Sequence, residues 1–226
     1  MVLTSISIQA VPLVLAAALA MQAGFYHLTV YKRRRNAADG YFVACCFTIA
    51  LYAAFFSLQL CVTDAATAVL SVYVQLWAVN LFGPSLLWFI HAYTRQRSNR
   101  FAQILTAAYL LLFVLSIAGP REWLSGARLE HALHVTPWSA TIPYLESQKG
   151  PLADLQMALH LVGIPYVTGL CALHLWRRRD GKAAALLLAI LVVCVAAAND
   201  IAVYEGWIRR TGSTISPTAL PAVPGL

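Results

Sequence analysis

The carboxylate that lies deepest in an apolar run of this sequence is Asp200, which follows Asn199 in the stretch Ala183–Ile208. The stretch is long enough to cross a bilayer as a helix, which takes ~20 residues. A charged side chain at that depth costs from ~2.5 kcal/mol upward, so we expect Asp200 to face protein or water. The pair therefore predicts a polar site inside a membrane protein.

Polar and aromatic residues recur at helical spacing in other apolar segments. Gln156 and His160 are four residues apart, and a stripe of similar spacing begins at Tyr73, so each set shares a helix face. If the segments are helices, these positions lie in the same half of the bilayer as Asp200. The predicted ligand-binding residues are Asp200, Asn199, Tyr204, His160, Gln156, Asn80, Trp77 and Tyr73. Ligand pockets are mostly apolar with a few convergent polar groups, and we expect this one to open to the outer side.

A structural role is the alternative for each of these residues. Polar side chains in membranes often bond a neighbouring helix, at ~0.6 kcal/mol on average. We favour that interpretation for Asn80 and Gln59. For Asp200 two possibilities remain open: a functional or switching role, and a structural contact with His160.

A second set of candidates consists of His27, His91 and His174, each a few residues before a basic cluster. Imidazole suits haem iron and copper, so a haem-binding membrane redox protein is the alternative function. No paired-histidine spacing within one segment supports a cofactor site, and we prefer an interfacial role beside tyrosine and tryptophan. We therefore expect no cofactor and no metal.

Motifs for other chemistry are missing from the sequence. It contains no GxSxG, P-loop or HExxH pattern and no paired carboxylates within an apolar segment. The five cysteines lie in apolar runs without a CxxC, which predicts neither structural disulfides nor a zinc site. We expect the chain itself not to be an enzyme.

Composition indicates an all-α integral membrane protein. The chain is 60% hydrophobic and 11% charged, with a mean hydropathy of +0.69, whereas soluble domains carry about 25% charged residues. The apolar runs are continuous for about twenty residues and do not alternate as barrel strands do. The net charge of +7 comes largely from three short Lys/Arg clusters, which argues against nucleic-acid binding.

Six full transmembrane helices are expected to position these side chains. Gly83-Pro84 predicts a kink in the third, and Gly163 and Pro165 predict another in the fifth. An apolar run that begins near Ser216 predicts the start of a seventh helix, within which the chain is cut off. The six predicted spans are Ile8–Tyr31, Tyr41–Val62, Ala66–Thr94, Phe101–Ala118, Leu152–Trp176 and Ala183–Ile208.

The basic clusters predict the orientation. Lys32–Arg35, Arg95–Arg100 and Arg177–Lys182 fall on one side of the predicted bundle, and an excess of Lys and Arg marks the cytoplasmic side. The N-terminus and the long loop of residues 119–150 are then outside the cell. Within that loop we expect His134–Tyr144 to pair as a short hairpin.

The order of these features resembles the seven-helix input domain of bacterial histidine kinases. In that family a Gly-Pro opens the fifth helix, which ends in a basic cluster, and the sixth carries an Asn, often in an Asn-Asp pair. The matching residues are Gly150-Pro151, Arg177–Arg179 and Asn199-Asp200. Ser216-Pro217-Thr218 looks like the start of the family's seventh helix, and GPSLLWFIHAYTRQ is similar to its third.

The resemblance implies that residues 1–226 form a single sensor domain of the bacterial inner (cytoplasmic) membrane. It would detect an extracytoplasmic or membrane-soluble signal and act on a C-terminal cytoplasmic effector, a histidine kinase or diguanylate cyclase, that is not in this chain. Its expected partners are the lipid bilayer, an unknown small-molecule ligand and the effector, and a homodimer is left open. A retinal photoreceptor and a small transporter rank lower, because the third helix has no carboxylate and no broken-helix pair is evident.

Overall fold

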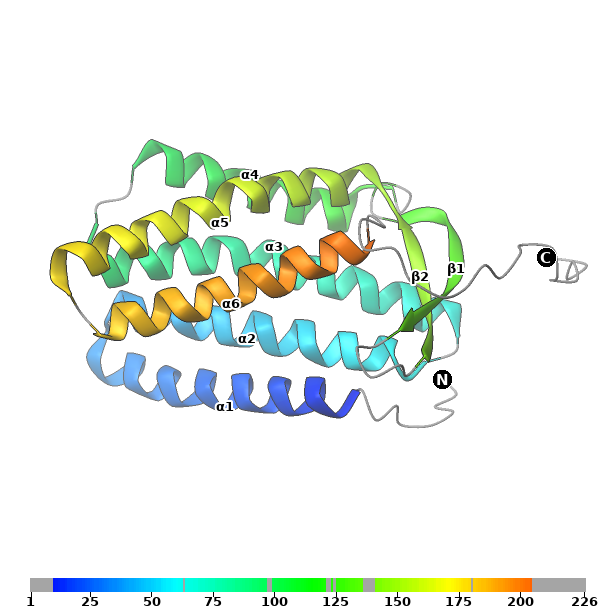
Figure 1. Ribbon diagram of the computed structural model, residues 1–226, viewed down its shortest axis with the longest axis horizontal. Helices are drawn as coiled ribbons and strands as arrows, with labels where there is room; N and C mark the ends of the chain where they lie inside the picture. Colours follow the sequence, from blue (N-terminus) through cyan, green and yellow to red (C-terminus); the bar gives the residue numbers. More distant parts are fainter. Residues whose placement is uncertain are drawn as a thin grey trace, which may run out of the picture.

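The long helices of the computed structural model lie side by side in an up-and-down bundle (Figure 1). The structure describes residues 10–62, 64–96, 99–120, 123, 125–135, 141–179 and 181–204. The helices are α1 (Ala10–Arg34), α2 (Ala37–Gln59), α3 (Ala65–Thr94), α4 (Arg100–Ala118), α5 (Pro151–Arg178) and α6 (Gly181–Tyr204). The predicted helices are thus confirmed, with ends that differ by a few residues.

Polar caps fix where the helices begin. The side chains of Asn36, Asp64 and Asn99 each accept a hydrogen bond from a backbone N–H in the first turn of α2, α3 and α4. At the other ends, α3 and α5 stop where Arg95 and Arg179 adopt left-handed backbone, with φ of 54° and 49°. These arginines also place positive charge at helix C-termini, where the helix dipole favours it.

The packing centres on α3, which touches α2, α4 and α5, while α1 packs on α2 and α6 on α5. The main apolar core lies where α3, α4 and α5 meet and includes Leu87, Ile90, Leu105 and Val167. Five helices, α1 to α5, are long and apolar enough to cross a membrane, and α6 adds the apolar segment Gly181–Val192. The predicted membrane-helix bundle is confirmed at this level. The predicted start of the seventh helix, from Ser216, lies outside the described residues.

The three clusters of basic residues gather at one end of the bundle, while Arg128 and Lys149 belong to the hairpin. The clusters lie at the C-terminal ends of α1 and α5, as in Lys32 and Arg177, and at the start of α4, at Arg100. Because neighbouring helices run in opposite directions, these ends meet at the side opposite the hairpin (Figure 1). We call this side the basic end and the other the hairpin end. Which end faces the cytoplasm stays a prediction.

A β-hairpin lies across the other end of the bundle (Figure 1). It consists of β1 (Ser125–Val135) and β2 (Thr141–Lys149), which pair antiparallel with His134 opposite Ile142 and Ala132 opposite Tyr144. The hairpin predicted for His134–Tyr144 is confirmed and extends further in both directions. The hairpin adds two strands to a bundle that is otherwise helical, and the strands satisfy each other's backbone groups by pairing.

Candidate functional site

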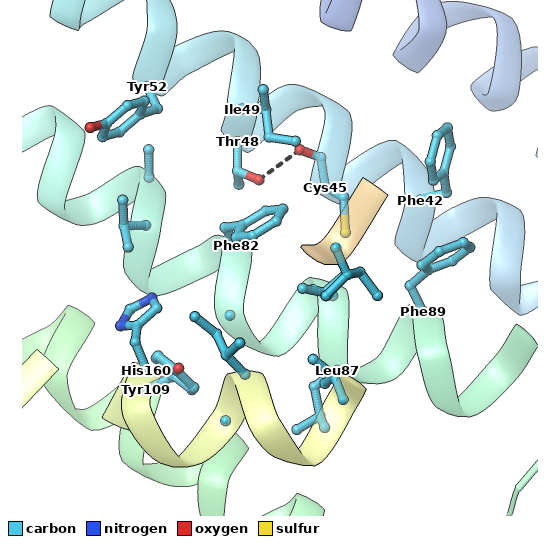
Figure 2. A pocket seen from close by; sticks show the side chains of 18 of the residues that line it. Phe42, Cys45, Thr48, Ile49, Tyr52, Phe82, Leu87, Phe89, Tyr109 and His160 are labelled. Carbon is cyan, nitrogen blue, oxygen red and sulfur yellow. Dashed lines mark hydrogen bonds between the residues drawn. The ribbon is translucent and has the colours of Figure 1, made fainter. Parts of the chain in front are cut away.

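A cavity of about 520 Å³ lies inside the bundle between α2, α3, α4, α5 and α6 (Figure 2). Its volume falls in the ~300–1,000 Å³ range of small-molecule sites. The residues lining it include Phe42, Cys45, Thr48 and Tyr52 of α2, Phe82 and Phe89 of α3, Tyr109 of α4, His160 and Val167 of α5, and Ala189 and Ile190 of α6. The lining is therefore mostly apolar, with a few polar groups.

The two ends of the cavity differ in chemistry. Tyr52, Tyr109 and His160 gather at one end, whereas Phe42 and Phe89 gather at the other (Figure 2). Along α2, Tyr52 is nearer the hairpin end and Phe42 nearer the basic end. The cavity thus has a polar end near the middle of the bundle and an apolar end toward the basic residues.

One ring nitrogen of His160 is unpaired. Its Nδ1 lies 2.7 Å from the backbone carbonyl oxygen of Gln156, one turn earlier in α5. Since a carbonyl only accepts, Nδ1 carries the proton of this bond, and Nε2 of the neutral ring is an acceptor. Nε2 is buried and has no partner among the described residues. A buried acceptor without a partner is costly, so this nitrogen is a place where a ligand group would be stabilised.

Tyr109 is wedged between two glycines of neighbouring helices. A Cβ on Gly83 would lie 2.7 Å from the Tyr109 ring, and one on Gly163 would lie 3.1 Å from its hydroxyl oxygen. The Tyr109 ring also meets the His160 ring edge to face, at 5.3 Å between centroids. The glycines predicted as kink signals beside Pro84 and Pro165 therefore make room for this tyrosine, which sits beside the candidate ligand group.

Of the five predicted ligand-binding residues whose side chains the structure describes, His160 lines the cavity and the other four do not. Tyr73 and Trp77 pack instead in an apolar cluster nearer the hairpin end, and the Trp77 indole donates to the Ser116 carbonyl at 3.4 Å. Gln156 is buried one turn from His160, and Asn80 is 2% exposed with its Oδ1 unpaired within the described part of the chain. Ligand contacts by these four residues stay predictions.

The predicted residues of α6 cannot be compared in the same way. Asn199, Asp200 and Tyr204 lie in the helical part of α6, and their side chains lie outside the described residues. A contact between Asp200 and His160 therefore stays a prediction. At ~1.5 Å per residue, Asp200 lies about 15 Å along α6 from Ile190, which lines the cavity.

Other polar residues tie helices together. The Gln75 side chain donates to Gln59 Oε1 at 2.8 Å, joining α3 to α2, so the interhelical role predicted for Gln59 is confirmed. At the basic end the Tyr166 hydroxyl donates to Asn99 Oδ1 at 3.2 Å and lies 3.1 Å from His91 Nε2. Because the single hydroxyl proton goes to Asn99, His91 donates to Tyr166. These three side chains, which we call the basic-end triad, connect α3, α5 and the start of α4.

The three histidines weighed as a cofactor layer have separate partners. His27 Nδ1 lies 3.1 Å from Asp39 Oδ1, His91 pairs with Tyr166, and the His174 ring lies 5.7 Å from that of Tyr93. Within the described part of the chain, no group of three His, Cys, Asp or Glu side chains is placed to hold a metal ion. Each of the three histidines thus has its own neighbour among the described residues, and the haem alternative stays a prediction.

Sequence reasoning missed Tyr109 and the α2 wall of the cavity. A signal for Tyr109 was present: a lone aromatic hydroxyl in the middle of an apolar helix, together with glycines in two other helices. Phe42, Thr48 and Tyr52 gave none, because an aromatic or threonine residue in an apolar run is usually ordinary packing.

One of the three comparisons with known proteins gave a match. The family model for the N-terminal 7TM region of histidine kinase matches residues 12–220. No curated protein and no solved structure matches the chain. The match covers the hairpin and the whole helical bundle except the first two residues of α1.

Proposed function

The chain belongs to the family of N-terminal seven-transmembrane regions of histidine kinases, and we propose that it senses a small molecule bound in the cavity between α2, α3, α4, α5 and α6. The signal would pass to a C-terminal cytoplasmic effector, a histidine kinase or a diguanylate cyclase. The observation that carries the proposal is Nε2 of His160, which has no partner among the described residues and lies on the wall of a mostly apolar cavity.

Transmission would run along α5. His160, Gly163 and Val167 border the cavity, and Tyr166 connects the same helix to His91 and Asn99. A ligand shifts an equilibrium only as far as it binds one state better than the other. We propose that the ligand favours one arrangement of α5 around Pro165, and that the basic-end triad carries this arrangement to the end of the bundle.

The proposed orientation places the basic end in the cytoplasm. Lys and Arg accumulate on the cytoplasmic side of membrane proteins, and the clusters of α1, α4 and α5 meet at this end. The hairpin and the start of α1 would then lie outside the bacterial inner membrane. The basic-end triad would be the part of the described bundle nearest the effector.

Asp200 keeps a proposed role distinct from the cavity. Its place on α6 is nearer the hairpin end than the residues of α6 that line the cavity. We propose that Asn199, Asp200 and Tyr204 border the outer approach to the site, together with Gln156. Asp200→Asn in the full-length protein tests this role through the concentration of signal that gives half-maximal output.

The proposal is tested by filling the cavity in the full-length protein. Ala189→Phe adds a ring to a residue that lines the cavity, whereas Ala184→Phe adds the same ring to a residue of α6 that is exposed, as Ala189 is, but does not line the cavity. In native membrane vesicles, phosphohistidine or cyclic-di-GMP formation should change several-fold with Ala189→Phe and stay at the native level with Ala184→Phe. Equal output from both variants and the native protein would overturn the proposal.

A further inference from the structure

We infer that the ligand of this cavity is a membrane-soluble neutral hydroxyl compound, with its hydroxyl on His160 and a long apolar body extending toward Phe42 and Phe89. The inference rests on the proposed function, because it names the ligand class of the same site. It depends on three features: which nitrogen of His160 is free, how the two ends of the cavity differ, and where the cavity adjoins the membrane.

Nε2 of His160 favours a ligand that carries a hydrogen-bond donor. Because Nδ1 of His160 is committed to the Gln156 carbonyl, Nε2 of the neutral ring can only accept. The Thr48 hydroxyl, which also lines the cavity, donates to the carbonyls of Ala44 and Cys45, both at 2.9 Å, so its donor is already used (Figure 2). A ligand that brings a hydrogen-bond donor gives Nε2 of His160 a partner that the described residues do not supply.

The lining selects against a charged head group. The described residues that line the cavity include no Lys, Arg, Asp or Glu, so an ionised ligand would lose its hydration without a counter-ion. A carboxylic acid, with a pKa of about 4, is ionised at neutral pH and then offers acceptors only. An ammonium group donates but carries a charge. A neutral hydroxyl meets both requirements.

The shape of the cavity places the apolar body. From His160 the lining continues past Phe82 to Phe42 and Phe89 at the far end (Figure 2). An apolar ligand body buried at this end is stabilised by roughly 25 cal/mol for each Å² removed from water, or by an equivalent gain in packing. The hydroxyl and the apolar body of one molecule therefore fit opposite ends of one cavity.

The wall between α2 and α6 provides the route. The described residues of α6 pack mainly against α5, and those of α2 pack against α1 and α3. Both helices line the cavity, but neither closes it against the other by extensive packing. A compound dissolved in the bilayer can enter laterally here, without crossing the hairpin end.

The first test uses three probes on the unmodified full-length protein in native membranes. The probes are photoreactive, alkyne-tagged analogues of hexadecanol, of its methyl ether and of hexadecanoic acid. At neutral pH we expect the alcohol to label peptides that contain residues 160–167 and 186–190 about fivefold more than the ether or the acid does, a ratio within the range of one hydrogen bond. Equal labelling by alcohol and ether would overturn the donor requirement, and stronger labelling by the acid would overturn the neutral head group.

Matched variants connect the labelling to His160. His160→Phe keeps a ring but removes the acceptor and should lower alcohol labelling to the ether level, while His160→Gln, whose amide oxygen accepts, should retain part of the preference. Ala189→Phe should reduce labelling by every probe, and Ala184→Phe should leave it unchanged. A preference that survives His160→Phe in folded protein would contradict the assignment.

The outcomes separate this inference from the proposed function. Selective alcohol labelling with no change of output in Ala189→Phe would support the ligand class and overturn the sensor role of the cavity. A changed output without selective labelling would support the sensor role and overturn the ligand class. A photoreactive residue at position 189 that captures the C-terminal segment of the same chain, in place of the alcohol, would show that the protein itself fills the cavity and would overturn this inference.

Discussion

The two sides of the cavity differ in how closely their helices pack: α3, α4 and α5 pack tightly on one side, whereas α2 and α6 leave space on the other. On one side Tyr109 of α4 fills the space at Gly83 so closely that a single added carbon would lie 2.7 Å from its ring. On the other side Ala189 of α6 borders about 520 Å³ of space that α2 does not close. Two small residues on the same cavity thus have opposite surroundings. The packed side of α3, α4 and α5 is suited to transmit a movement, and the open side of α2 and α6 is suited to admit a ligand.

The largest effect is expected on the packed side. Gly83→Ala places a Cβ against the buried Tyr109 ring, and overpacking of this kind costs about 1–3 kcal/mol. The loss should appear as a lower unfolding temperature of the protein purified in mild detergent. Gly169→Ala is the matched control, because a Cβ there meets nothing within 4 Å, and it should be neutral or slightly stabilising.

A second variant checks the cause. In a Tyr109→Leu background the ring that the added Cβ would contact is absent, so Gly83→Ala should cost much less stability there. An equal loss in both backgrounds would mean that Gly83 matters for backbone flexibility beside Pro84 and not for the approach of Tyr109. The distinction between the two sides would then lose its main support.

The next effect tests the connection from the packed side to the basic end. Tyr166→Phe removes the hydroxyl that accepts from His91 and donates to Asn99, and we expect a loss of about 1 kcal/mol in the free energy of unfolding. Tyr26→Phe is the control, because that side chain is 67% exposed on α1. If Tyr166 also transmits the signal, output in membrane vesicles should change with Tyr166→Phe alone. A loss of stability with normal signalling would limit the triad to a structural role.

Sequence reasoning predicted the parts of the fold that depend on local chemistry. The six helices follow from apolar runs bounded by polar caps and basic clusters, such as Asp64 before α3 and Arg177 after α5, and these signals lie within a few residues of the ends they set. The hairpin was predicted too short, because its outer pairs, such as Leu129 with Ser147, depend on a register that the turn residues alone do not give.

The candidate site was predicted less well, for a physical reason. His160 was found because a titratable residue in an apolar helix is costly and so informative. The cavity itself depends on which helices fail to pack, and that is a property of pairs such as α2 and α6 that no single segment carries. In the sequence, an aromatic residue such as Phe42 or Phe89 looks the same whether it lines a cavity or packs in a core. The sequence therefore indicated a polar contact but not the space beside it.

A smaller effect on stability is expected at the hairpin end of α3, the helix that borders both the packed and the open side of the cavity. The hydroxyl and the backbone N–H of Thr67 hold the pKa of the Asp64 carboxyl below its usual value, and the N–H bond is 2.8 Å long. A lowered pKa in the folded state means that the stabilisation is complete above the unfolded value of about 3.9 and is lost as pH falls through the folded value. Unfolding temperature should therefore be insensitive to this group between pH 7 and 5 and should fall in stronger acid.

The control at this position is Asp64→Asn, which keeps a capping oxygen but does not titrate. Compared with the native protein, this variant should lose less stability in acid, with a difference smaller than that of Tyr166→Phe. An identical acid response would assign the pH dependence to other carboxylates. Because α3 borders both the packed and the open side, this measurement gives the stability that the Asp64 cap contributes to the bundle. The effects of substitutions on either side can be compared with that value.

The smallest effect on stability should come from the largest added side chain. Ala189→Phe adds a whole ring, yet the ring has a cavity to enter, so we expect the unfolding temperature to stay within the range of surface substitutions, about 0.5 kcal/mol. One added carbon at Gly83 would then cost more stability than six added carbons at Ala189. If Ala189→Phe destabilises the bundle as much as Gly83→Ala does, the space between α2 and α6 cannot accommodate a ligand. A stable variant with altered output would mean that occupancy of this space, rather than the strength of the bundle, sets the state of the receptor.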